Sequence, residues 1–330
     1  MTMNKSAIDF PCEPFRIEEV PEGTHRPLWS VMIPAYNCAK YLRQTLASVL
    51  AQDPGPEQMQ IEVVDDCSTK DDPEAVAREM AGGRVAFYRR PQNGGVTANF
   101  NTCLQRSRGH LVHILHGDDY VLPGFYAKLA DMAQNHPSVS SFFVRCQFVE
   151  EDGTLDCISP PNRHLFQPSR SPGNLLYNND LQTPGVVVRR SFYETRGGFL
   201  PCLVHVADWE MWVRAISQEG GLFLNELLAA YRFFPTNESG RLARTGENLR
   251  AYLRLADIFE SHFADFNTAR FRALVAQRAL QQEKCFADIG DKDAASANHK
   301  LWRELTPWTL RWEPALRGLL SSLKRGLFNH

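Results

Sequence analysis

The sequence predicts an α/β domain with a mostly parallel central sheet and flanking helices, followed by an α-helical C-terminal region. Short apolar segments alternate with amphipathic ones early in the chain, which is the pattern of parallel strands joined by right-handed helical crossovers. Two of the apolar segments end in adjacent carboxylates, Asp65/Asp66 and Asp118/Asp119. From Asn248 onward the apolar residues recur at helical spacing.

Composition and length set the broad class. The chain has 330 residues, 43% hydrophobic and 22% charged, which allows one large domain plus an appended piece. A formal net charge of −2 gives no bulk attraction to nucleic acid. No apolar segment approaches the ~20 residues of a transmembrane helix. We therefore divide the chain into an N-terminal extension (1–27), the α/β domain (28–240) and a helical region (241–330).

Cysteine usage bears on the redox compartment. The eight cysteines include no C-x-x-C pair, which argues against a zinc site or a dithiol redox motif. Most of them lie in apolar or mixed segments, where cysteine packs as a small hydrophobe. A reducing cytosol is the simpler interpretation.

The first four predicted strands alternate with three predicted helices. The strands cover residues 29–33, 61–64, 84–88 and 111–115, and the helices cover 39–52, 73–80 and 96–106. Asn37 is the predicted N-cap of the first helix. Pro73 suits the first turn of the second helix, where its missing N–H costs nothing.

The rest of the chain is predicted in the same way. Asp152-Gly153 lies between two β-rich segments and indicates a hairpin. A Pro-rich loop follows at residues 159–174, then a strand at 185–189 and a short helix that begins at Ser191. A second helix covers 207–214, and a strand covers 222–231. Residues 232–247 read as a polar loop. The last predicted helices cover 249–263, 268–289, 294–305 and 316–327.

The acid pairs predict a ligand site. In open α/β sheets, ligands bind just outside the carboxyl ends of the strands. Adjacent carboxylates there repel each other unless a cation compensates, and a hard divalent ion shared with substrate phosphates is the usual solution. A turn after the strand would explain Asp118-Asp119 equally well in isolation. The second pair, Asp65-Asp66, favours the site.

Two common nucleotide-binding motifs are missing from the sequence. There is no G-x-G-x-x-G after the first strand and no G-x-x-x-x-G-K-[ST] anywhere. Neither an ordinary dinucleotide fold nor a P-loop NTPase is supported. A nucleotide would instead be held by acids and loops, with a metal bridging its phosphates.

Five segments in a fixed order carry a resemblance to a known family. They are Ser30–Asn37, Val64–Ser68, Asn93–Asn101, His116–Asp119 and Asp208–Arg214. Each is weak alone, but together and at this spacing they resemble the family 2 glycosyltransferases of the GT-A fold. The resemblance covers roughly residues 29–235.

The resemblance implies roles for individual residues. The nucleoside pocket would be lined by Pro34, Tyr36, Asn37, Asp66, Asn93 and Gly95. Asp66 would accept a hydrogen bond from the base. Of Asp118 and Asp119, one would contact the ribose and the other a Mg²⁺ or Mn²⁺ ion on the diphosphate. Asp208 would be the catalytic base of an inverting transfer, although an isolated Asp at a helix start is also a favoured N-cap.

The sequence departs from the family pattern at two places. The acid motif commonly begins with Asp where this chain has His116, which leaves a metal ligand, a supporting donor or a turn histidine as alternatives. A histidine often follows the last strand, where this chain has Phe233-Phe234. Arg241 or Arg244 could supply the missing positive charge, although a solvated loop arginine is the simpler explanation for each.

The function implied is transfer of a sugar from a nucleotide sugar, with UDP favoured, to a glycan or lipid-linked acceptor in cell-envelope or surface-glycan synthesis. A sugar-phosphate nucleotidyltransferase is the first alternative, but it needs a Gly-rich basic loop where this chain has Pro34–Asn37. A non-catalytic nucleotide-sugar-binding subunit is the second. The full set of Asp66, Asp118, Asp119 and Asp208 argues against a decayed site.

The C-terminal segment 310–327 combines Trp312 and several leucines with four basic residues. This composition fits a helix packed on its own domain, which is the better explanation, or one lying on a membrane surface. We therefore expect a cytoplasmic protein, with peripheral contact at the inner face of the membrane as the alternative.

Overall fold

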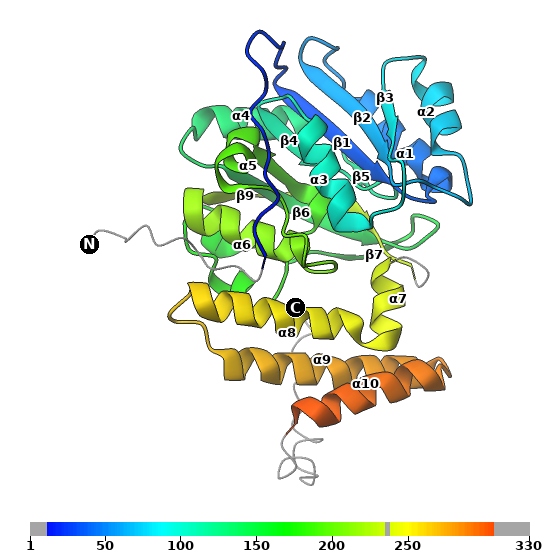
Figure 1. Cartoon of the computed structure of the whole chain (residues 1–330), viewed down its shortest axis with the longest axis vertical. Coiled ribbons are helices and arrows are strands. Elements are labelled where there is room, and N and C mark those ends of the chain that lie inside the picture. Colours follow the sequence, from blue (N-terminus) through cyan, green and yellow to red (C-terminus); the bar gives the residue numbers. More distant parts are fainter. Residues whose placement is uncertain (1–11, 235–237, 307–330) are drawn as a thin grey trace. The chain divides into compact units, whose positions relative to one another are not determined.

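The computed structural model describes residues 12–234 and 238–306. The chain divides into two compact units, residues 1–234 (unit 1) and 235–330 (unit 2) (Figure 1). Unit 1 is an α/β domain, and the described part of unit 2 is helical. None of the helices in the described ranges is both long enough and apolar enough to cross a membrane.

The elements of unit 1 follow the predicted order. Its strands are β1 (Trp29–Ala35), β2 (Met59–Asp65), β3 (Ala86–Arg89), β4 (Leu111–Ile114), β5 (Tyr120–Val121), β6 (Ser141–Val149), β7 (Leu155–Ile158), β8 (Val186–Arg189) and β9 (Gly221–Arg232). Its α-helices are α1 (Ala39–Leu50), α2 (Pro73–Ala81), α3 (Val96–Arg106), α4 (Phe125–Asn135), α5 (Arg190–Arg196) and α6 (Ala207–Glu219). Among the strands and α-helices of the described part of unit 1, β5 and α4 are the ones that the sequence did not predict.

The strands of unit 1 form one sheet in the order β3-β2-β1-β4-β8-β6-β9-β5, with β7 paired to β6. β3, β2, β1 and β4 are parallel to one another. β8 runs antiparallel to β4 and to β6, whereas β6 and β9 are parallel. The predicted parallel sheet is therefore confirmed for the first four strands and gives way to a mixed sheet beyond them. The carboxyl ends of β1, β2 and β4 meet at one edge.

Helices bury both faces of the parallel part. Alternate side chains of β1, including Val31 and Ile33, pack in one core cluster with Leu42 and Leu46 of α1 and with residues of α4. Met32 is also fully buried. Because successive side chains of a strand point to opposite faces, Met32 points to the other face, where α3 contacts β1, β2 and β4.

Helix α6 carries a buried ion pair. The Arg214 guanidinium bonds to the Glu210 carboxylate at 2.8 Å, and both side chains are less than 5% exposed. Arg214 also donates hydrogen bonds to the carbonyls of Arg196 (2.7 Å) and Gly198 (2.8 Å). These bonds fix α6 against the chain that follows α5.

An extended N-terminal arm, residues 12–27, lies on unit 1. Ile17 of the arm is 3% exposed, and the carbonyl of Phe15 accepts a hydrogen bond from the N–H of Gly198 (2.6 Å). The arm begins with a disulfide between Cys12 and Cys202. This bond differs from the sequence interpretation, in which cysteine usage favoured a reducing cytosol, and no local pattern links two cysteines that are 190 residues apart. Other cysteines do pack as buried small hydrophobes: Cys38, Cys103 and Cys146.

Unit 2 contains α7 (Glu238–Thr245), α8 (Glu247–His262), α9 (Thr268–Asp288) and α10 (Lys292–Leu305). The three long helices confirm the prediction. The polar loop expected over 232–247 is wrong from Glu238 onward, where α7 forms and packs on α8 and α10. Only two residues of this polar helix are buried, Gly240 and Leu242, so its sequence carries little apolar periodicity. The helix predicted at 316–327 lies outside the described residues.

Replacing Arg214 with Met should destabilise unit 1, because the buried Glu210 carboxylate would lose its countercharge. Breaking one side of a buried pair typically costs about 3–5 kcal/mol. Urea unfolding followed by tryptophan fluorescence measures the loss. Arg196→Gln is the control, since Arg196 pairs with Glu219 near the surface, and such a pair contributes at most about 1 kcal/mol. Equal effects of the two substitutions would contradict the prediction.

Candidate active site

The loops after β1 and β2 are joined by Asn37. Its backbone is left-handed, with φ 50°, and its Oδ1 accepts hydrogen bonds from the N–H groups of Thr69 and Lys70, both at 2.9 Å. The N–H of Asn37 donates to Oγ of Ser68 at 2.8 Å. Asn37 therefore shapes the edge of the expected nucleoside pocket by holding the two loops together.

Asn37 is not the N-cap of α1, so this prediction is wrong. Cys38 takes that position without a side-chain bond, and Oδ2 of Asp71 accepts the hydrogen bond from the N–H of Ala39 (2.8 Å). The side chain that accepts a hydrogen bond from the start of α1 therefore comes from the loop after β2, which the residues around Asn37 do not indicate.

Pro34 and Tyr36 differ in their availability to a ligand. Pro34 is buried in β1, and its carbonyl accepts a hydrogen bond from the N–H of Gly117 (3.0 Å), which ties β1 to the acid motif. The side chain of Tyr36 is 49% exposed. The ring of Tyr36 is thus open to a planar ligand, whereas the buried Pro34 contributes to the site through its backbone carbonyl and its position at the end of β1.

Asp66 brings three of the predicted residues together. It is 3% exposed, and its carboxylate accepts hydrogen bonds from the N–H groups of Gly94 (3.0 Å) and Gly95 (2.9 Å) and pairs with Arg90. The Nδ2 of Asn93 donates to the Asp66 carbonyl at 3.2 Å. Gly95 has φ 83°, which favours glycine, and is the N-cap of α3. Asp66 therefore organises the 93–95 loop, and the sequence did not predict its partner Arg90.

Asp119 is the most constrained residue of the acid motif. Its side chain is 1% exposed, Oδ1 accepts a hydrogen bond from the N–H of Arg232 (2.8 Å), and Oδ2 lies 3.0 Å from Nδ1 of His116. The Oγ1 of Thr45 in α1 donates to the Asp119 carbonyl at 2.6 Å and lies 3.1 Å from the Gly117 carbonyl. Both carboxylate oxygens of Asp119 therefore already have protein partners.

Arg232, at the end of β9, is the cation that the sequence analysis missed in this site. It is 3% exposed, and its guanidinium donates to the carbonyls of Asp118 (2.9 Å) and Glu151 (2.7 Å) and to Oε1 of Gln44 (2.6 Å). The residues considered for this charge, Arg241 and Arg244, pair with Glu238 and Asp291 in unit 2.

Arg232 also borders a cleft of about 730 Å³, whose other lining residues are Lys40, Tyr41, Gln44, Glu150, Glu151, Asp152 and Thr154.

Asp118 and His116 complete a group that suits a divalent cation. Ligand atoms of His116, Asp118 and Asp119 all lie within 4.8 Å of one another. Desolvation, followed by the charge of Asp119, raises the pKa of Asp118 to about 6. Burial disfavours the charged form of His116, but the bond to Asp119 and the charges of Asp119, Asp118 and Asp208 outweigh it and raise its pKa. The carboxylate of Asp118, with the charge of Asp119 beside it, fits a Mg²⁺ or Mn²⁺ ion.

Asp208 lies in the first turn of α6 and is not its N-cap, which is Val206. Desolvation is the main cause that raises the pKa of the Asp208 carboxyl. The amide of Asn179 lies 3.4 Å from Oδ2 of Asp208, and His116 interacts with it electrostatically. Asp208 and His116 therefore lie close enough for their charges to interact, while the role of Asp208 as the catalytic base stays a prediction from the family resemblance.

The sequence matches a known protein family and several other proteins. The model of Glycosyl transferase family 2 matches residues 30–193. An uncharacterized protein of Mycobacterium tuberculosis is 29% identical over 236 residues, 68% of this chain and 73% of that protein. Another from the same species is 32% identical over 211 residues, and the match spans 58% of its length. An uncharacterized glycosyltransferase of Methanocaldococcus jannaschii is 23% identical over 213 residues, 63% of this chain and 71% of that protein.

Solved structures give the fold. TarS residues 1–349 of S. aureus, in complex with UDP, align with a TM-score of 0.54 and 17% identity over 85% of this chain and 92% of that one. The mannosyltransferase PcManGT of Pyrobaculum calidifontis, in complex with GDP-Man and Mn²⁺, aligns with a TM-score of 0.53 and 16% identity over 98% of this chain and 85% of that one. With the family match and the α/β sheet described above, the chain belongs to glycosyl transferase family 2 and is a glycosyltransferase of the GT-A fold.

Proposed function

We propose that this glycosyltransferase transfers a sugar from a nucleoside-diphosphate sugar, with UDP as the favoured nucleotide, to a hydroxyl of a glycan or lipid-linked acceptor, with inversion of the anomeric carbon. The observation that carries the proposal is the grouping of His116, Asp118 and Asp119, whose ligand atoms lie within 4.8 Å of one another after β4. Such acceptors belong to cell-envelope and surface-glycan synthesis. The complexes of TarS with UDP and UDP-GlcNAc support a UDP-sugar donor.

The nucleoside would bind at the carboxyl ends of β1 and β2. The exposed ring of Tyr36 offers a stacking face, and Asp66 offers its carboxylate to a base N–H. Arg90 already pairs with Asp66, so an incoming base must share or displace this guanidinium. Asn93 and Gly95 would border the base because both bond to Asp66.

The diphosphate would lie at the acid motif. Asp118 would hold a Mg²⁺ or Mn²⁺ ion, since the oxygens of Asp119 are engaged by Arg232 and His116. Asp119 would add charge and keep the motif in place. The bound cation supplies stabilisation of the negative charge on the leaving diphosphate. The Mn²⁺ in the PcManGT complex supports this arrangement.

Asp208 would take the proton of the acceptor hydroxyl as that hydroxyl attacks. A hydroxyl is a poor nucleophile until a base removes its proton, and a carboxylate whose pKa is raised is a stronger base than an ordinary one. One base and a direct attack from the side opposite the leaving group invert the anomeric carbon.

Binding of UDP should require both a divalent cation and Asp118. Isothermal titration calorimetry with Mn²⁺, with EDTA and with Asp118→Asn tests this, with GDP titrated in parallel. We expect affinity to fall by several kcal/mol without the metal and in the variant, because the diphosphate loses its counterion. Asp131→Asn, a change on the exposed side of α4, should bind UDP normally. Equal affinities under all conditions would refute the metal site, and a preference for GDP would replace UDP as donor.

Asp208→Asn should abolish most turnover while sparing the donor site. The amide keeps the size of the side chain but cannot accept the proton, and general-base catalysis typically contributes ~10²–10⁴-fold. UDP release is measured with a panel of glycan and lipid-linked acceptors, and donor affinity by calorimetry. We expect donor affinity within a few-fold of the parent and an unchanged melting temperature. Glu219→Gln, at the other end of α6, is the control, and normal turnover in Asp208→Asn would place the base elsewhere.

Peripheral membrane contact through residues 310–327 stays a prediction from the sequence, because this segment lies outside the described residues. Each basic residue near an anionic surface contributes about 1 kcal/mol. We expect flotation with anionic liposomes at low salt, and its loss on changing the segment's basic residues to Gln: Arg311, Arg317, Lys324 and Arg325. The control changes exposed basic residues of α9 and α10: Arg272, Lys284, Lys292 and Lys300. Equal flotation of both variants would refute membrane binding by this segment.

A further inference from the structure

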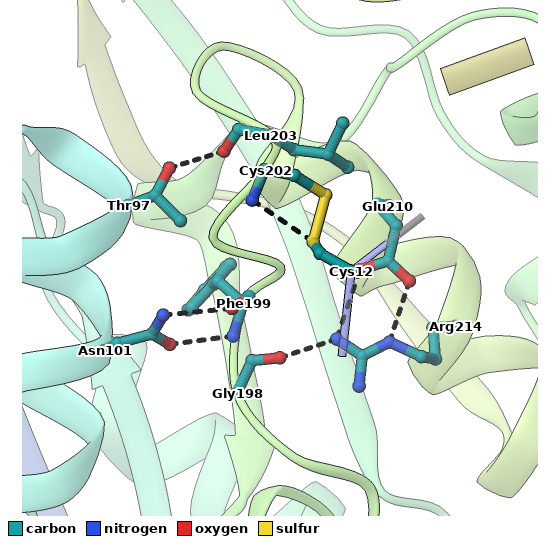
Figure 2. Close-up of a disulfide and its surroundings, with 9 residues drawn as sticks. All are labelled: Cys12, Thr97, Asn101, Gly198, Phe199, Cys202, Leu203, Glu210 and Arg214. Carbon is teal, nitrogen blue, oxygen red and sulfur yellow. Dashed lines mark hydrogen bonds and ion pairs between the residues drawn. A yellow bond between two sulfur atoms is a disulfide. The ribbon is translucent and has the colours of Figure 1, made fainter. Parts of the chain in front are cut away.

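The segment between α5 and α6, residues 197–206, leads directly into the helix that carries Asp208. Helix α3 holds it on one side (Figure 2). The amide of Asn101 donates to the carbonyl of Phe199 (2.9 Å) and accepts from its N–H (2.8 Å), and Oγ1 of Thr97 donates to the carbonyl of Leu203 (2.6 Å). The same helix begins at Gly95, in the loop that Asp66 organises. One helix thus contacts both the expected donor pocket and the segment before Asp208.

The start of this segment is also held from α6. Arg214 donates to the carbonyl of Gly198 at 2.8 Å while it pairs with Glu210 (Figure 2). These bonds are buried, so water does not compete with them. Near residue 198 the segment is therefore fixed by the interior of unit 1.

The middle of the segment is more exposed and is anchored by the N-terminal arm. Cys202 is exposed, and Val204 is 53% exposed. The disulfide joins Cys202 to Cys12, and the N–H of Cys202 lies 3.2 Å from Sγ of Cys12 (Figure 2). Leu200 and Leu203 on either side of this exposed residue are buried, so the covalent link adds a second anchor to the one that their packing supplies.

We propose that the Cys12–Cys202 disulfide is a reversible clamp that positions Asp208 for the transfer step, and that its reduction lowers turnover while leaving donor binding intact. This inference rests on the proposed role of Asp208 as the base. It makes Cys12 and Cys202 positioning residues, because neither touches the reacting atoms. The donor residues lie after β1, β2 and β4, whereas the disulfide joins the arm to the segment between α5 and α6.

The redox step is a thiol–disulfide exchange with a dithiol. A thiolate of the dithiol attacks one sulfur of the pair, which breaks the S–S bond, releases one cysteine thiolate and leaves a mixed disulfide with the other. The second thiolate of the dithiol then attacks the mixed disulfide and releases the second cysteine thiolate. The pair gains two electrons and two protons and becomes two thiols, and the dithiol becomes a disulfide. The exposure of Cys202 gives the reductant access to the bond.

Release of the clamp should act on turnover because the base must be closely aligned with the acceptor hydroxyl. A displacement of about 1 Å in a positioning element can cost on the order of 10²-fold in rate. Arg214, Asn101 and Thr97 keep their bonds after reduction, so the displacement should be partial. We expect kcat to fall about tenfold.

The experiment compares the intact protein before and after treatment with dithiothreitol, together with Cys12→Ser and Cys202→Ser. Mass spectrometry after alkylation counts the free thiols, calorimetry measures UDP affinity with Mn²⁺, and hydrogen exchange reports opening of residues 198–206. We expect reduction and each variant to lower kcat similarly, to speed exchange in that segment, and to leave the UDP dissociation constant within about twofold. Reoxidation should restore the parent only, and dithiothreitol should not affect Cys12→Ser further.

Several outcomes would overturn the proposal and are distinct from failure of the proposed function. Eight alkylatable thiols before reduction would show that the bond does not form, and unchanged exchange and kcat after verified reduction would show that it positions nothing. Inhibition of Cys12→Ser by dithiothreitol would assign the effect to another thiol or to the metal. Cys157→Ser, which removes an exposed free thiol, is the matched control. An oxidised parent inactive with every nucleotide sugar would instead refute the proposed function, while hydrogen exchange still reports on the clamp.

Discussion

The active-site edge of the sheet is governed by the cost of keeping carboxylates out of water. Asp65, Asp66 and Asp119 are each at most 3% exposed, and a carboxylate in such a position needs hydrogen-bond donors or a countercharge. Each finds them on a different part of the chain. Asp66 is satisfied by Arg90 and two backbone N–H groups, and Asp119 by His116 and the end of β9. The loops of the site are therefore held in place by the hydrogen bonds that they donate to these buried carboxylates.

This constraint separates the roles within the acid motif. Asp119 is fully engaged by the protein and acts as a structural anchor for the backbone around it. The pKa of Asp118 is raised first by desolvation and then by the charge of Asp119. A cation is what such a carboxylate needs. Under the proposed function, Asp119 would hold the loop in place and Asp118 would bind the cation.

Much of this could be predicted from local patterns. The alternation of strands and helices was visible up to Leu115, and the rule that ligands lie at the carboxyl ends of parallel strands located the acids. The parts that could not be predicted depend on distant residues. Arg90 and Arg232 bond to Asp66 and to the acid motif across 24 and 113 or more positions. The disulfide spans 190 residues. The local pattern of apolar and polar residues contains no information about such contacts.

The same holds for misassigned local signals. Asn37 has the residue type of a helix N-cap, but its amide bonds to the next loop, so a tertiary contact overrode the local preference. Helix α7 was read as loop because its sequence is polar. In both cases the decisive contacts are tertiary: Asn37 bonds to the loop after β2, and α7 packs on α8 and α10.

The hydroxyl of Thr45 shows how the site limits change elsewhere in the protein. It is fully buried in α1 and lies within hydrogen-bond distance of two carbonyls of the acid motif. Valine has nearly the same shape, but it would leave those carbonyls without their donor, so equal volume does not make the exchange neutral. In a redesign of α1 for thermostability, Leu42 and Leu46 could be replaced by other apolar residues, whereas Thr45 could not. Evolutionary drift of the helix is restricted at that position by the loop it supports.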